Sequence, residues 1–274
     1  MSAMTFDLTS TPAVPFWRLV LVETRKTVDT VASFWLVMSM FIITVLLDGF
    51  VMLAAILQSS PVNYFDFTQL SLVATSVLLP ILGVLLVTGE WGQRTAMVTF
   101  SLEPRRLRVV LAKLVVGLVL TVATVLIALV VALACTLVCE LFNGDQTTWG
   151  ATTTGFEGTD ASGPALLVGY LLTQAIAMTS GFALAALLLN TPAAIVVYLV
   201  YSFALPGVLF AVSAIWTDFA DVSPYLNFVE AQAPLATLSL GSAEEWLQLF
   251  TSGLLWLGLP LGLGLLRILR AEVK

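Results

Sequence analysis

Long apolar segments alternate with short polar ones along the whole chain, and six of the apolar segments are long enough to cross a bilayer. Crossing the roughly 30 Å hydrocarbon core as a helix takes about 20 residues. A lone segment in hydrocarbon satisfies its backbone hydrogen bonds internally only as a helix. The pattern therefore predicts an all-α, polytopic membrane protein with six transmembrane helices, at about 34–57, 70–89, 114–139, 164–189, 193–215 and 247–266.

A shorter segment before the first span, residues 16–32, has the pattern of an amphipathic helix. Trp17, Val20 and Leu21 fall on one side of it, whereas Arg18 and Arg25, followed by Lys26, give it a charged side. Such a helix is expected to lie in the membrane interface. It is either a juxtamembrane anchor alone or also a contact surface for a cytoplasmic partner. We divide the chain into a cytoplasmic tail with this interfacial helix, 1–33, and one six-helix membrane domain, 34–274.

The distribution of charge predicts the orientation. All 11 Lys and Arg residues lie in three clusters, 18–26, 94–113 and 267–274. The connections 58–69, 140–163 and 216–246 contain acids and no base. Because positive loops stay in the cytoplasm, we expect cytoplasmic N- and C-termini in the plasma membrane. The net charge of −6 is then an asymmetry across the membrane, and we expect no nucleic-acid partner.

Local signals predict two connections in more detail. Asn190 and Pro192 suit the end of one helix and the first turn of the next, which makes spans four and five an antiparallel hairpin. Ser242 and Glu245 match a capping box that starts span six. Between spans five and six, a short helix is expected to begin at Ser223 and to end near Pro234. The loop 140–163, rich in Gly and Thr, is expected to be irregular.

The residue inventory excludes several chemistries. The chain has no His, so imidazole catalysis and His metal ligation are absent. None of its three Lys residues lies in a phosphate-binding loop. Cys135 and Cys139, one turn apart in span three, are expected to be packing residues. We predict no catalytic site, no metal and no cofactor in this chain.

Asp48 is the one acid well inside a predicted span. Intramembrane acids usually mark a pathway or a polar cavity. Either Asp48 lines such a cavity, as part of a substrate pathway, or span one emerges into water or outer headgroups around it.

The cytoplasmic loop between spans two and three carries the most distinctive pattern. Glu90 and Arg94 are spaced to pair on a helix, and Met97 and Phe100 form an adjacent apolar patch. The helix expected here ends in the segment from Ser101 to Pro104, which includes Glu103. Arg105, Arg106 and Arg108 then crowd the positive end of the next helix dipole, and anionic lipid headgroups could compensate for them.

Here the chain resembles the type-2 ABC exporter permeases, especially actinobacterial forms. The resemblance rests on Glu-Trp-x-Gln-Arg-Thr-Ala-x-Val-Thr-Phe at Glu90–Phe100 and on Pro-Arg-Arg at Pro104–Arg106, together with the basic helix before span one and the six-span layout. It covers the whole chain in layout but only about twenty residues in motif. The resemblance implies that residues 90–103 form a coupling helix on a separate ATPase subunit, with Glu90, Arg94, Met97, Phe100 and Glu103 at the contact. It also implies that 16–31 supports this helix and that 223–233 holds re-entrant helices.

The resemblance further implies a homodimer of permeases, with ATP and Mg²⁺ bound only in the partner subunit. The family's pathway uses spans two and five, where the polar or aromatic candidates are Thr75, Ser76, Tyr198, Tyr201 and Phe203. Neutral walls of this kind suit an amphipathic or lipidic substrate. The alternative function is an autonomous membrane protein, a secondary carrier or an immunity or scaffold protein, without an ATPase partner.

Overall fold

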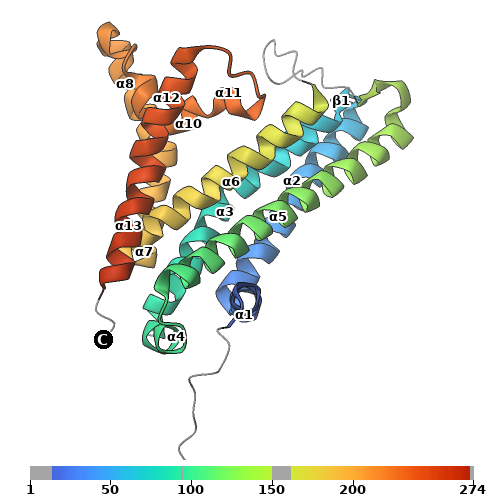
Figure 1. Ribbon diagram of the computed structural model, residues 1–274. Helices are drawn as coiled ribbons and strands as arrows, with labels where there is room; N and C mark the ends of the chain where they lie inside the picture. Colours follow the sequence, from blue (N-terminus) through green and yellow to red (C-terminus); the bar gives the residue numbers. More distant parts are fainter. Residues whose placement is uncertain (1–13, 94, 150–161, 272–274) are drawn as a thin grey trace, which may run out of the picture.

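The computed structural model describes residues 14–93, 95–149 and 162–271, and it is built almost entirely from helices (Figure 1). Among the described residues, six helical stretches are long and apolar enough to cross a membrane, which confirms an all-α, multi-pass architecture. They are α2 (Val31–Gln58), α3 (Tyr64–Gly92), α5 (Arg106–Asn143), α6 (Gly163–Leu188) and two composite helices, Thr191–Ile215 and Ala243–Arg270. Each coincides with one of the six predicted spans, and most extend beyond it because the polar end turns continue the helix. The exception is α6, which ends at Leu188, one residue before the predicted end.

The two composite helices are interrupted by π turns. The fifth span consists of α7 (Thr191–Leu199), η2 (Val200–Ala204) and α8 (Leu205–Ile215), and the sixth consists of α12 (Ala243–Gly253), η4 (Leu254–Gly258) and α13 (Leu259–Arg270). Each π turn ends just before a proline, Pro206 or Pro260. Proline lacks the N–H that a helix needs and clashes with the preceding turn, and a π turn absorbs this defect.

Spans two and four form the centre of the bundle. Leu79 and Leu82 of α3 and Met178 and Phe182 of α6 are fully buried in one core cluster. The two helices approach closely, because a Cβ atom on Gly181 would lie only 2.2 Å from the carbonyl oxygen of Pro80. Small residues permit this contact in membrane helices.

The helices form two groups that converge at one end of the molecule and diverge toward the other (Figure 1). The convergent end carries α1 (Phe16–Asp29), α4 (Ala96–Leu102) and the last residues of α13. We call it the basic end, since it holds all the described Lys and Arg residues, and we call the opposite end the acidic end. At the acidic end, β1 (Val62–Asn63) pairs in parallel with β2 (Thr147–Thr148) after η1 (Gly144–Gln146), so the first part of the loop expected to be irregular is ordered.

The other connections agree only partly with expectation. Asn190 caps the start of α7, accepting a hydrogen bond from the Ala193 N–H at 3.0 Å, whereas the left-handed Leu189 ends α6. The capping box of Ser242 and Glu245 is confirmed. A helix begins at Ser223 as expected, but it ends at Leu226. The region holds four short helices and not one: η3 (Thr217–Phe219), α9 (Ser223–Leu226), α10 (Phe228–Ala231) and α11 (Ala233–Ala236). Pro234 lies in the first turn of α11 rather than at a helix end.

Candidate functional site

Four charged side chains from three helices form a closed ring at the basic end. Glu23 and Lys26 belong to α1, Glu90 to the end of α3 and Lys113 to the first turns of α5. The Lys26 Nζ lies 2.8 Å from Glu23 Oε1 and 2.9 Å from Glu90 Oε1, and the Lys113 Nζ lies 2.7 Å from Glu23 Oε2 and 3.3 Å from Glu90 Oε1. We call these four residues the charge ring.

Three members of the charge ring are buried. The side chains of Glu23, Lys113 and Glu90 are 2%, 8% and 10% exposed, and that of Lys26 is 42% exposed. Burying a charge is costly unless it is paired, and here every charge contacts two of opposite sign. Burial lowers the pKa of Lys26, but its hydrogen bonds to Glu23 and Glu90 outweigh this, so the pKa is raised above its ordinary 10.5. The ring therefore keeps the Lys26 charge throughout the neutral range.

The charge ring also holds α4. The Thr99 hydroxyl donates to Glu90 Oε1 at 3.0 Å, and the backbone N–H of Thr95 donates to the Glu90 carbonyl at 2.9 Å. The sequence predicted that Glu90 pairs with Arg94 on one coupling helix, and the structure arranges Glu90 differently. Glu90 belongs to α3 and binds Lys26, Lys113 and Thr99 instead, while Arg94 lies outside the described residues. The sequence did contain a signal for the pairing of Glu90 with Lys113. A base beside the apolar run of span three, such as Lys113, needs an acid at similar depth.

Helix α1 packs on the bundle through the side that carries Val20, Glu23 and Thr27. Glu23 and Thr27 are buried, and Val20 of the predicted apolar side packs against the core. Trp17 and Leu21 of that apolar side are exposed, as is Val28. Arg18 and Arg25 are also exposed, and the Arg18 guanidinium lies 5.6 Å from the centre of the Trp17 ring. The helix is thus fastened by charge and leaves an apolar side outward, as a helix in the membrane interface requires. Its location in the interface stays a prediction.

Helix α4 has one side against the bundle and one side away from it. Ala96 is buried, and the ring of Phe100 lies 6.3 Å from that of Trp91 with the Arg106 guanidinium 5.1 Å above it. Met97, Val98 and Leu102 point away, and the last two are 60% and 81% exposed. Met97 and Phe100 therefore do not form one patch, as the sequence suggested. The outward apolar face, which we define as Met97, Val98 and Leu102, includes two residues that sequence reasoning missed.

The arginines after α4 bind protein groups. The Arg106 guanidinium donates to the carbonyl oxygens of Ile268 and Ala271 at 2.8 and 2.7 Å, which caps the end of α13. Arg108 pairs with Glu103 at 3.2 Å and donates to the Val14 carbonyl at 2.6 Å. Arg105 is exposed. The protein itself thus compensates for much of the charge that was assigned to lipid headgroups, and lipid contact stays a prediction.

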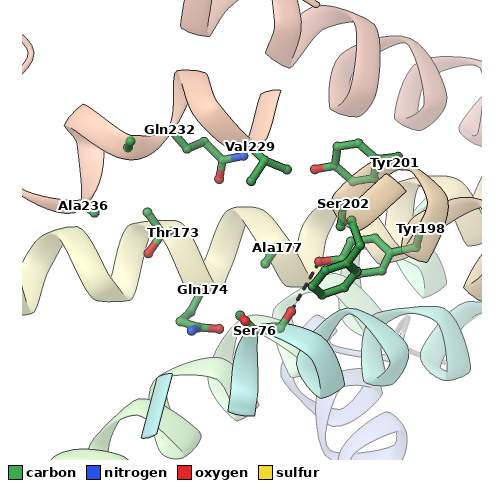
Figure 2. Close-up of a pocket in the computed structure, with 12 residues that line it drawn as sticks. Ser76, Thr173, Gln174, Ala177, Tyr198, Tyr201, Ser202, Val229, Gln232 and Ala236 are labelled. Atoms are coloured by element: carbon green, nitrogen blue, oxygen red, sulfur yellow. Dashed lines mark hydrogen bonds between the residues drawn. The ribbon is translucent and has the colours of Figure 1, made fainter. Parts of the chain in front are cut away.

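A second region of interest is a pocket of about 310 Å³ between α3, α6, η2 and the short helices α10 and α11 (Figure 2). Four predicted pathway residues line it: Ser76, Tyr198, Tyr201 and Phe203. The Tyr198 hydroxyl donates to the Ser76 carbonyl at 3.3 Å. Tyr201, in the π turn η2, stacks on Trp256 of the other π turn with ring centres 4.8 Å apart. The signal for these π turns was Pro206 and Pro260 within apolar spans.

Two predicted pathway residues lie elsewhere. Thr75 is buried, donates to the Leu72 carbonyl at 3.1 Å, and lines a different pocket between α1, α2 and α5. Asp48 has no exposed surface and accepts a hydrogen bond from the Ser71 hydroxyl, and it lines neither pocket. The expectation that span one emerges into water at Asp48 is therefore wrong. Asp48 fastens α2 to α3 inside the bundle.

Within the described residues, no group of three His, Cys, Asp or Glu side chains is arranged to hold a metal ion. Compared with models of known protein families and with curated proteins, the sequence shows no match.

Proposed function

We propose that this chain is the non-catalytic, membrane-spanning permease subunit of an ATP-driven ABC exporter. In this proposal the basic end faces the cytoplasm of the plasma membrane, and the outward apolar face of α4 docks on a separate ATPase subunit that binds ATP and Mg²⁺. Two permease copies, identical or closely similar, form the substrate pathway between them.

The way α4 is mounted is the observation that carries this proposal. Its outward apolar face lies on a short helix outside the spans, whereas its inward side is fixed to α3 through Glu90 and to α13 through Phe100 and Arg106. An exposed apolar patch at the edge of a membrane domain suits a protein partner. Through the ion pairs of the charge ring, α1 and α5 are connected to the same end of α3 that holds α4. Movement of a docked partner would thus reach three of the six spans, α3, α5 and α13, together with the interfacial helix α1, which is what coupling to ATP hydrolysis needs.

Purification of the chain from its own membranes in mild detergent tests the assembly. We expect a complex of two permease chains with two copies of an ATPase that contains a phosphate-binding loop. A chain that purifies alone and catalyses transport without ATP would contradict the proposal and would favour an autonomous carrier.

Orientation is tested by thiol labelling. In a variant without Cys135 and Cys139, we expect a single cysteine at Ser239 to react with an impermeant thiol reagent on intact cells, because this exposed position lies at the acidic end. A single cysteine at the exposed Ser101 should react only after lysis. Labelling of Ser101 on intact cells would invert the orientation.

A further inference from the structure

The wall of the pocket between α3, α6 and η2 contains a buried hydrogen-bond acceptor with no partner. Gln174 of α6 is 4% exposed. Its Nε2 donates to the Leu72 carbonyl of α3 at 2.9 Å, which fixes the amide, and its Oε1 has no partner among the described residues. Figure 2 shows the Gln174 side chain beneath the pocket, with its oxygen toward Ser76. A buried acceptor left unpaired is costly, and a bound donor would remove that cost.

The remaining wall restricts the chemistry of such a donor. None of the residues that line the pocket carries a charge. A charged group moved into these neutral surroundings within the bundle would lose its hydration without gaining a counter-ion. The wall combines apolar and aromatic side chains, among them Ala177, Tyr201 and Val229, with neutral polar ones. The polar ones besides Gln174 are Ser76, Thr173, Ser202 and Gln232. Phe203, which also lines the pocket, is 59% exposed. Its ring offers an apolar contact for a chain that continues out of the pocket.

We infer that this pocket binds an uncharged amphipathic molecule whose hydroxyl or amide N–H donates to Gln174 Oε1 and whose apolar part lies against Tyr201 and Phe203. An acylglycerol has this chemistry. The molecule is either a cargo or a resident bilayer lipid. The binding site itself does not depend on the proposed transport function.

The test uses the purified full chain in phosphatidylcholine nanodiscs and monooleoylglycerol with a diazirine in its acyl chain. Photolabelling should fall on peptides around residues 170–177 and 228–236, as mapped by mass spectrometry. An excess of unlabelled monooleoylglycerol should lower the labelling at least tenfold. Its analogue with both hydroxyls methylated, which has no donor, and oleate, which is charged, should compete at least tenfold more weakly.

Two variants and one control complete the test. Gln174→Leu removes the acceptor, and Ala177→Leu fills the pocket while Gln174 is retained; each should lower labelling at least tenfold. Ala175→Leu, on the same helix but outside the pocket, should label as the native chain does. If Gln174→Leu does not fold, Ala177→Leu carries the test alone. Equal labelling of the native chain and Ala177→Leu, or equal competition by the methylated analogue, would overturn the inference.

A last arm distinguishes the two sources of the ligand and is the only one that rests on the proposed function. With the partner ATPase present, addition of ATP should release a cargo and so lower the labelling, whereas a resident lipid would stay and label equally. Both results support the binding site. The labelling experiments without ATP therefore test the binding site, and this arm alone tests whether the bound molecule is transported.

Discussion

Replacing Lys113 with Met should lower the free energy of unfolding by about 3–5 kcal/mol, the usual cost of removing one partner from a buried ion pair. Lys26 would still contact both acids, but Glu23 Oε2 would lose its ion-pair contact and the ring would keep one excess negative charge. The Lys113 Nζ contacts both acids of the charge ring, at 2.7 Å from Glu23 and 3.3 Å from Glu90. Met has a similar length and fits the same space, so the variant loses charge with little change in packing. Reversible unfolding followed in detergent, or steric trapping in a bilayer, measures the effect.

The matched control is Lys26→Met. This change removes the same number of acid contacts, but the Lys26 side chain is 42% exposed and Lys113 still contacts both acids. Exposed ion pairs contribute only about 0–1 kcal/mol, so we expect a much smaller loss. The double variant Glu23→Gln/Lys113→Met should be more stable than the sum of its single changes predicts, because it removes the excess negative charge that Lys113→Met leaves in the ring. Equal losses for Lys113→Met and Lys26→Met would contradict a buried ring.

Placing Asp at Val98 and Leu102 should abolish association with the ATPase while leaving the permease folded in the membrane. Both side chains are exposed on the outward apolar face and support no core contact. Burial of each on docking would contribute about 1.5–3 kcal/mol, and the new charges would have to be desolvated. The combined loss is therefore at least about 100-fold in affinity, which co-purification and ATPase turnover would detect.

The control for this change keeps the surface apolar. Val98→Leu/Leu102→Met conserves hydrophobicity and approximate volume, so association should stay near the native level. Phe100→Ala acts differently, since Phe100 packs inward against Trp91 and Arg106. We expect Phe100→Ala to loosen the mounting of α4 and to weaken association less than the Asp variant does. Full association of the Asp variant would exclude the outward apolar face as the docking surface.

Much of the fold was predictable because membrane insertion depends on the length and hydropathy of single segments. The six spans and the Ser242 capping box follow from local patterns of this kind. The charge ring did not follow, because Glu23, Glu90 and Lys113 lie far apart in the sequence and only packing brings them together. Glu90 was recognised as important, but a local pairing with Arg94 was the simplest hypothesis that spacing alone could support.

The pocket was predictable in part. Ser76, Tyr198, Tyr201 and Phe203 stood out as polar or aromatic exceptions in apolar spans, and they do meet in space. Gln174 is not predictable in the same way, because the sequence of span four does not indicate that this helix forms a wall of the pocket. Asp48 was misplaced because depth along one helix does not tell which neighbour covers the carboxylate. The Asp48 carboxylate accepts a hydrogen bond from the Ser71 hydroxyl, and this contact depends on the register of α2 against α3.

Site-specific photocrosslinking at Val98 tests whether α4 docks on a separate ATPase subunit. A benzophenone amino acid at this position, in the native cell and membrane, should crosslink to a polypeptide that contains a phosphate-binding loop. The same amino acid at Ser239, at the acidic end, should give no such product. Absence of that product at Val98, with transport that continues when ATP is depleted, would contradict the proposal that this chain is the permease of an ATP-driven exporter.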